Sequence, residues 1–243
     1  VILSLVRAAL RADYESVFLC GLTLILLILP SVFARRLHIE LPGTLEIIVL
    51  LFIYAAEILG EINSFYVRVP NWDTMLHTIN GFLCAAVGFA LVDLLNRDER
   101  FSLQLSPKYL ALTAFCFSMT VGVLWEFFEY FMDSFFNLDM QKDAIIHSIG
   151  SVSLDTSLTN TVIRIGDIQD VILVHSDGSS RALGLGGYLD VGLHDTMKDL
   201  LVNLAGAAIF SVIGYIAADK KGESKVAIRF VPQVLSDEDT IEK

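Results

Sequence analysis

Five apolar segments of about 20 residues or more constrain this chain more than any other feature of its sequence. A helix needs about 20 mostly apolar residues to cross the hydrocarbon core of a bilayer. Hydrophobic residues make up 54% of the chain and its mean hydropathy is +0.62, which is too apolar for a typical soluble domain. The sequence therefore predicts an integral membrane protein, with candidate spans at residues 16–34, 44–63, 73–95, 107–133 and 194–217.

The chain begins with VILSLVRAAL, an apolar stretch too short to cross a bilayer. We interpret it as the end of a further span, because no small-residue cleavage site of a signal peptide follows it. The predicted fold is an all-α membrane protein, with about six transmembrane helices in a bundle and a small extracytoplasmic β-hairpin insertion. Residues 1–134 would hold helices one to five with the first truncated, 135–190 the extracytoplasmic loop, 191–218 the last helix and 219–243 a cytoplasmic acidic tail.

Lysine and arginine collect on one side of the predicted membrane, whereas the short segments on the other side offer only Arg11 and Arg68. Short cytoplasmic loops carry an excess of these residues, so the C-terminus is expected in the cytoplasm. The basic side carries Arg35, Arg36, Arg97, Arg100, Lys108, Lys220, Lys221, Lys225 and Arg229.

The net charge of -11 argues against nucleic acid as a partner.

The predicted extracytoplasmic loop has its own pattern. Runs rich in β-branched residues at 161–165 and 169–175 precede a Ser-Asp-Gly-Ser turn at 176–179 and a further short run. This pattern is typical of a small β-hairpin module. We interpret the module as a lid or cap, because it contains no nucleophile constellation of its own.

Ionisable residues interrupt four of the predicted spans at helical spacing, so each set lies along one stripe of its helix. Given the predicted orientation, all of them fall near the external ends of their spans. Acidic groups far outnumber the nearby cationic candidates His77, His194 and Lys198. Buried carboxylates must then hold protons, bind a cation or face water. The sets are Glu57 and Glu61; Asp73 and His77; Glu126 and Glu129; and Asp195 and Asp199, whose stripe continues to the neutral amide of Asn203.

Three interpretations of these sets remain open. In the first, the acids lie at the interface and cap helices, which suits Asp73 and Asp195 in first turns but not Glu126 and Glu129 near a helix C-terminus. In the second, they bind a divalent ion such as Mg²⁺, Mn²⁺ or Zn²⁺ through carboxylates and one imidazole. In the third, they relay protons or ions during transport. The first interpretation, helix capping at the interface, gives no role to Asp199 and Asn203, which lie deeper in the predicted membrane.

Small and aromatic residues accompany the acidic sets. Gly81 and Gly206 belong to stretches of small residues that let helices approach closely. Trp72 and Trp125 fall at the external boundary of the predicted bilayer, where an aromatic belt is expected. We assign these four residues structural roles around a polar pocket.

Three motifs resemble those of bacterial YjdF-like integral membrane proteins, a family without an established activity. The resemblance runs from about residue 44 to 217 in the right order, and it implies a helical protein of the bacterial cytoplasmic (inner) membrane. The motifs are Trp72-Asp73-x-x-x-His77-x-x-x-Gly81-Phe82, Gly122-x-x-Trp125-Glu126-x-x-Glu129 and Asp195-Thr196-x-x-Asp199-Leu200-x-x-Asn203-x-x-Gly206.

The first and last motifs also look, more loosely, like those of VanZ-like membrane proteins, whose namesake is associated with low-level teicoplanin resistance. This chain departs from that pattern, because Glu126-x-x-Glu129 replaces the usual Glu-x-x-Gln and Arg stretch. The hairpin insertion before the last helix is a second departure. The glycopeptide role is therefore not transferred.

We expect a multi-pass protein with an acidic, externally facing pocket that binds a divalent cation and acts on a lipid or envelope-linked small molecule. Whether it is an enzyme stays open; if it is, transfer or hydrolysis at a phosphate ester is expected, with a carboxylate or His77 as general base. The alternatives are an ion- or proton-coupled transporter using the same carboxylates, and a structural partner that docks through the hairpin. First-choice pocket residues are Asp73, His77, Glu126, Asp199 and Asn203; second choices are Glu57, Glu61, Glu129 and Asp195.

Overall fold

The computed structural model describes residues 1–36, 39–97, 105–220, 224 and 229–234. The chain divides into two compact units, which we describe separately. The first unit contains Val1–Trp125 and Asp199–Lys243, and the second contains Glu126–Lys198. Among the residues expected on the basic side, Arg100, Lys221 and Lys225 lie outside the described residues, as does the acidic end at 236–243.

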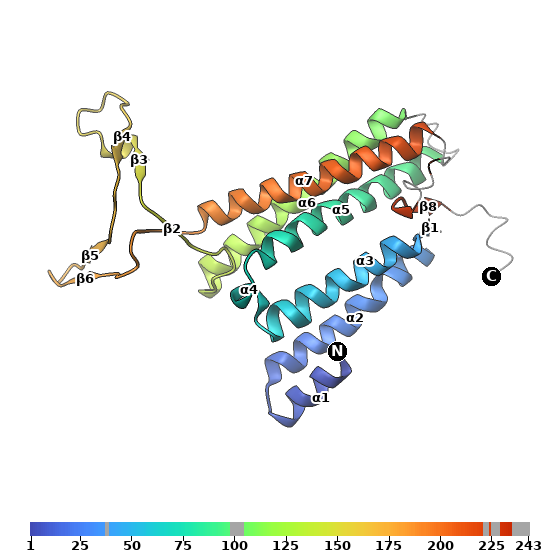
Figure 1. Ribbon diagram of the computed structural model, residues 1–243, viewed down its shortest axis with the longest axis horizontal. Helices are drawn as coiled ribbons and strands as arrows, with labels where there is room; N and C mark the ends of the chain where they lie inside the picture. Colours follow the sequence, from blue (N-terminus) through green and yellow to red (C-terminus); the bar gives the residue numbers. More distant parts are fainter. Residues whose placement is uncertain (37–38, 98–104, 221–223, 225–228, 235–243) are drawn as a thin grey trace. The chain divides into compact units, whose positions relative to one another are not determined.

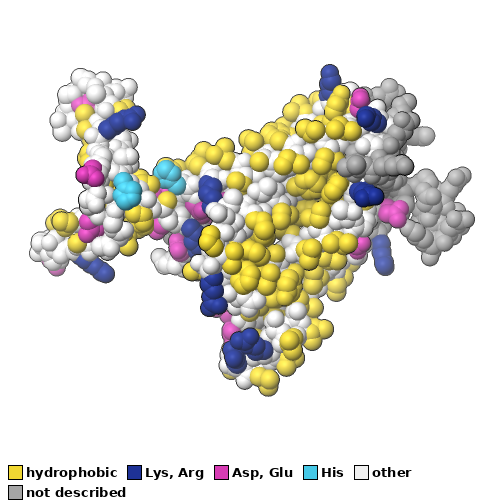
Figure 2. Space-filling view, viewed as in Figure 1, with side chains coloured by type: hydrophobic (Ala, Val, Ile, Leu, Met, Phe, Trp, Pro, Cys, Tyr) yellow, Lys and Arg dark blue, Asp and Glu magenta, His cyan; other side chains and the backbone are white. Residues whose placement is uncertain are grey.

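Four described helices are long and apolar enough to cross a membrane. Each begins and ends within three residues of a predicted span, and hydrophobic side chains cover much of the visible helical surface (Figures 1 and 2). Length and hydropathy therefore located these helices correctly. They are α2 (Tyr14–Arg36), α5 (Trp72–Arg97), α6 (Pro107–Phe136) and α7 (Leu193–Asp219).

Local signals explain where two of these helices begin. The Asp13 carboxylate accepts a hydrogen bond from the backbone N–H of Ser16 at 3.2 Å, which satisfies one of the free donors at the start of α2. Pro107 occupies the first position of α6, where its fixed φ suits a helix and its missing N–H is not needed.

The other two expected spans take a different form. The N-terminal stretch forms α1 (Ile2–Leu10), which has nine residues. The segment expected at 44–63 forms α3 (Gly43–Tyr54), which continues into the π-helix η1 (Ala55–Ile62), and the short helix α4 (Phe65–Arg68) follows. The wider turn is visible where the backbone N–H of Asn63 donates to the carbonyl of Ile58, five residues earlier. A bundle of six spans thus stays a prediction.

Aromatic and small side chains fill the core of the first unit. Phe210 on α7 is fully buried and packs edge-to-face on Phe82 and Phe89 of α5, with ring centroids 5.2 and 6.1 Å apart. Gly214 allows this contact, because a Cβ there would lie 2.9 Å from the Phe89 ring. This packing fixes α5 against α7 over the half of α7 that follows the acidic residues.

A short antiparallel pair joins two distant parts of the first unit. Strand β1 (Ile39–Glu40) pairs with β8 (Gln233–Val234), and Val231 is 7% exposed. This piece of the segment predicted as a cytoplasmic acidic tail therefore contributes Val231 to the hydrophobic core.

The second unit contains three antiparallel strand pairs, in which β2 (Ala144–Ile146) pairs with β7 (Tyr188–Asp190). Strand β5 (Ile172–Val174) pairs with β6 (Ser180–Ala182) around the predicted turn, where the N–H of His175 donates to the carbonyl of Ser179. That hairpin is confirmed. The earlier β-branched run forms β4 (Ile163–Ile165), which pairs with β3 (Ile149–Ser151), and the 3₁₀ helix η2 (Val152–Leu154) follows β3.

Asp155 organises the loop between η2 and β4. Its carboxylate accepts hydrogen bonds from the hydroxyl of Ser157, from the hydroxyl of Thr159 and from the backbone N–H groups of Ser157, Thr159 and Thr161. These donors, the Ser157 hydroxyl first, hold the pKa of Asp155 well below its usual range. The loop is thus built around a charged carboxylate.

This loop is expected to loosen in acid. The folded-state pKa of Asp155 lies below the unfolded value of about 3.9, so its stabilising contribution is present above pH 3.9 and is lost as pH falls toward the folded pKa. Asp155→Asn should loosen the loop at neutral pH, which faster hydrogen exchange at the Thr159 and Thr161 amides would report. The control is Asp167→Asn, since that carboxylate accepts from the Gln169 side chain. Unchanged exchange in Asp155→Asn would contradict the role of the carboxylate.

Candidate functional site

The first turns of α5 bring Asp73 and His77 together. They are four residues apart on one helix, and His77 Nε2 lies 3.6 Å from Asp73 Oδ1. His77 is 9% exposed, whereas the Asp73 side chain is 29% exposed. Trp72 packs edge-to-face on Phe65 with ring centroids 5.0 Å apart, which fixes the start of α5. The pair therefore sits at a defined helix end, with the imidazole on the buried side.

Asp199 of α7 completes a cluster with this pair. One ligand atom from each of Asp73, His77 and Asp199 lies within 4.8 Å of the other two, and Asp199 is 1% exposed. Two ionised carboxylates no more than 4.8 Å apart repel each other by at least about 3.5 kcal/mol at an effective dielectric constant of about 20. A bound cation or a proton would relieve this repulsion.

Two glycines determine how closely α5 and α7 approach beneath the cluster. A Cβ on Gly81, one turn beyond His77, would collide with the backbone carbonyl of Asn203. A Cβ on Gly206 would likewise collide with the backbone carbonyl of Thr78. Backbones in such contact require residues without side chains, as in other membrane helix pairs. The close approach holds Asp199 within reach of His77.

Asn203 fills the space where α5, α6 and α7 meet. It is 1% exposed, and its Nδ2 donates to the carbonyl of Ser118 at 3.4 Å. Gly122 leaves room for it, since a Cβ there would lie 2.7 Å from Nδ2. The hydroxyl of Ser118 in turn donates to the carbonyl of Gly81 at 2.7 Å. Asn203 Oδ1 is buried without a hydrogen-bond partner among the described residues.

Ser118 is a buried contact position beside the cluster that the sequence did not single out. It lies four residues before Gly122, on the same stripe of α6, and its backbone and hydroxyl contact both partner helices. That helical spacing from a glycine is the one signal that could have identified it. Its role is to fix the helices on which the cluster residues stand.

The other predicted pocket residues are not part of the cluster. Glu57 is half-buried and Glu61 exposed on η1. Glu126 and Glu129 lie on the part of α6 that belongs to the second unit and are 5% and 7% exposed. Asp195, also in the second unit, accepts a hydrogen bond from the backbone N–H of Lys142 at 2.8 Å.

Asp195 therefore has a local structural contact, as does its neighbour Thr196, whose hydroxyl accepts from Gln141 Nε2 at 2.6 Å. Both contacts join the start of α7 to the segment that follows α6. Trp125 is 44% exposed, as an aromatic residue at a membrane surface would be.

Comparison with known proteins places the chain in a family. The model of a family described as predicted membrane proteins, DUF2238, matches residues 1–220. The chain belongs to this family. It is also similar to an uncharacterised protein of Thermotoga maritima, with 25% identity over 104 residues, which is 43% of this chain and 52% of that relative. The chain thus spans about half the length of that relative. No solved structure matches.

The family description indicates a membrane protein and gives no activity, so any chemical role must be argued from the cluster. Tetrahedral coordination with Zn–N and Zn–O distances near 2.1 Å separates ligand atoms by about 3.4 Å, close to the 3.6 Å between His77 Nε2 and Asp73 Oδ1. The Asp199 ligand atom lies within 4.8 Å of the other two, so all three are within reach of one cation. Two carboxylates and an imidazole suit Mn²⁺ or Zn²⁺, and Mg²⁺ with additional oxygen ligands.

Proposed function

We propose that this membrane protein holds a divalent cation between α5 and α7, with Asp73, His77 and Asp199 as its ligands. The observation that carries the proposal is the convergence of three ligand atoms within 4.8 Å from two helices held together by glycines. A divalent ion would neutralise two carboxylates in a site where charge is costly. The protein would supply three ligands and leave coordination positions open.

The open positions indicate the substrate class. Divalent ions held by one or two carboxylates commonly take phosphate oxygens as further ligands. A lipid or envelope-linked molecule carrying a phosphate group fits such a site, because it can reach a cation at a membrane surface. In this proposal six spans cross the cytoplasmic membrane, the cluster faces outward, and the C-terminus is cytoplasmic, as the distribution of arginine and lysine favours.

A metal titration of the purified full-length chain tests the proposal. After removal of metals with a chelator, the protein should bind one equivalent of Zn²⁺, Mn²⁺ or Mg²⁺ by calorimetry, with elemental analysis of the product. Asp199→Asn and His77→Gln should each weaken binding at least tenfold, because each loses a direct ligand. Asp219→Asn, at the exposed far end of α7, is the matched control and should bind as the unmodified protein does.

Two results would contradict the metal site. One is unmodified protein that binds no divalent ion; the other is unchanged affinity in Asp199→Asn and His77→Gln. If the protein binds no metal but carries out proton-coupled uptake of a solute, that result would instead favour the proton or ion relay. The observation favouring that second function is the burial of two further carboxylates, Glu126 and Glu129, on α6.

A further inference from the structure

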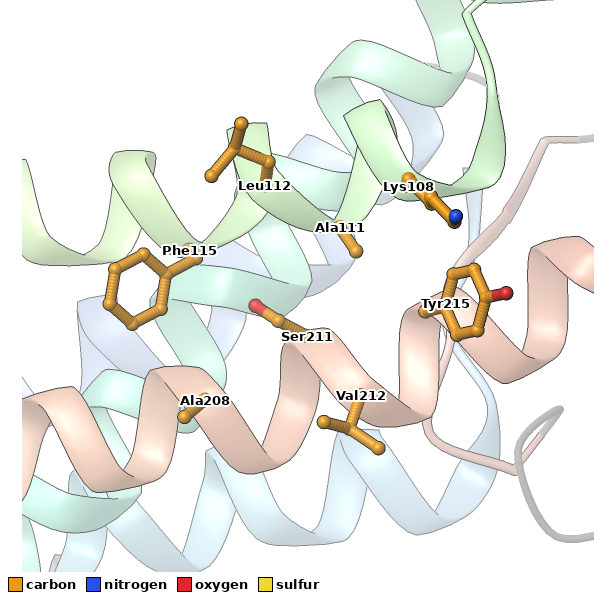
Figure 3. Close-up of a pocket in the computed structure, with 8 residues that line it drawn as sticks. All are labelled: Lys108, Ala111, Leu112, Phe115, Ala208, Ser211, Val212 and Tyr215. Atoms are coloured by element: carbon orange, nitrogen blue, oxygen red, sulfur yellow. The ribbon is translucent and has the colours of Figure 1, made fainter.

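A groove of about 530 Å³ lies between the first turns of α6 and the last turns of α7 (Figure 3). Its size is within the range of small-molecule sites. Most of its lining is apolar, and the aliphatic side chains of Leu112 and Val212 are 55% and 58% exposed. The lining residues are Lys108, Ala111, Leu112, Phe115, Ala208, Ser211, Val212 and Tyr215.

The polar groups of the groove gather toward one end. Figure 3 shows the Lys108 nitrogen and the Tyr215 oxygen at the same end, with Phe115 and Ala208 at the other. No ion pair with a described residue neutralises Lys108, which is exposed. The groove thus combines a cationic, hydroxyl-bearing end with an apolar body. An amphipathic anion matches this distribution.

Ser211 provides an independent sign of a ligand. It is 9% exposed, and its hydroxyl has no hydrogen-bond partner among the described residues. Hydroxyls on neighbouring α6 are used otherwise: Thr113 donates to the carbonyl of Tyr109, and Thr120 donates to that of Cys116. A buried hydroxyl without a partner costs free energy, so an acceptor supplied from outside the chain would satisfy it.

We propose that this groove binds one anionic phospholipid. Lys108 and Tyr215 contact the phosphate, and Ser211 donates to an ester carbonyl of the glycerol unit. Leu112, Phe115 and Val212 line an acyl chain. Ser211 and Tyr215 are one helical turn apart, about 6 Å along the axis, which suits the separation of a phosphate from the adjacent ester. Basic sites between transmembrane helices are recognised places for anionic headgroups.

The lipid site is separate from the proposed metal site. Ser211 follows Asp199 by twelve positions on α7, a distance of about 18 Å along the helix. The lipid therefore does not depend on the cation, and its loss and the loss of metal binding can be measured independently.

Lipid retention by the purified full-length chain tests the proposal. Delipidated protein is mixed with phosphatidylglycerol or phosphatidylcholine of identical acyl chains, and bound lipid is counted by native mass spectrometry. Unmodified protein should retain one phosphatidylglycerol in preference to phosphatidylcholine. Lys108→Gln should lower the affinity for phosphatidylglycerol about fivefold and remove the preference. Ser211→Ala should lower both affinities about threefold to tenfold.

Two further variants complete the experiment. Lys220→Gln removes the same charge beyond the groove and should leave the preference intact. Ala208→Phe fills the groove and should prevent retention of either lipid. The proposal is overturned if unmodified protein holds both lipids equally, if Lys220→Gln acts as strongly as Lys108→Gln, or if Ala208→Phe still retains lipid. It is also overturned if the groove proves to be the interface of a dimer that Ala208→Phe dissociates.

Discussion

Gly206→Ala is expected to separate α5 from α7, to lower stability and to weaken the proposed cation site. The added methyl group would collide with the carbonyl of Thr78, which is backbone and cannot rotate away. Overpacking of this kind typically costs about 1–3 kcal/mol, and more where backbone must move. Because the helices can relieve the collision only by moving apart, Asp199 would also move away from His77.

Thermal unfolding in detergent, together with the metal titration, would measure both effects. Gly21→Ala on α2 is the matched control, since nothing lies within 4 Å of a Cβ at that position. There alanine should be neutral or stabilising by up to about 1 kcal/mol, because it favours the helix over glycine. If Gly206→Ala unfolds at the same temperature as Gly21→Ala, the proposed backbone contact is wrong.

The second large effect is expected from Phe210→Ala. Phe210 is fully buried between two rings of α5, so its removal leaves a cavity and abolishes both edge-to-face contacts. We expect a loss of about 3 kcal/mol, at the lower end of the range of about 3–5 kcal/mol for core phenylalanines. The lower end applies because helices that separate within a bilayer pack against lipid and not against water. The cost of the substitution then comes from lost protein contacts and not from hydration of apolar surface.

Phe18→Ala on α2 is the control for this variant, because Phe18 is 69% exposed and the same atoms are removed from a lipid-facing position. Its effect should stay within about 0.5 kcal/mol. Equal destabilisation by the two substitutions would show that the Phe210 packing does not hold α7 in place.

The long spans could be predicted from the sequence because they depend on composition and length alone. The π-helix at Ala55–Ile62 could not be predicted, because changing the spacing of the backbone hydrogen bonds from four residues to five leaves the apolar sequence pattern unchanged. Strand pairing was recognised where a turn motif joins the strands, as at 176–179. It was missed for Ile149–Ser151, whose Ile-Gly-Ser sequence carries no strand signal.

The candidate site was predictable at the level of single helices. The spacing of Asp73 and His77 and the stripe through Asp199 and Asn203 both follow from helical periodicity. Which stripes converge depends on the rotation of one helix against another, and here the contacts of Gly81 and Gly206 determine that rotation. Helical periodicity could not predict the contact of Asp195, because its carboxylate accepts a hydrogen bond from the backbone N–H of Lys142, 53 residues earlier in the chain.

The interlocked backbones of α5 and α7 also restrict the motions available to the protein. A Cβ at Gly206 would overlap the Thr78 carbonyl, so the two backbones are in close contact there, and we expect this contact to resist sliding or rolling of one helix past the other. We expect any opening that admits a ligand to the cluster to come from segments outside this pair. The segment that precedes α5 is the place to look for such a hinge, because Ser64 and Asn71 there both have a positive φ of 59°.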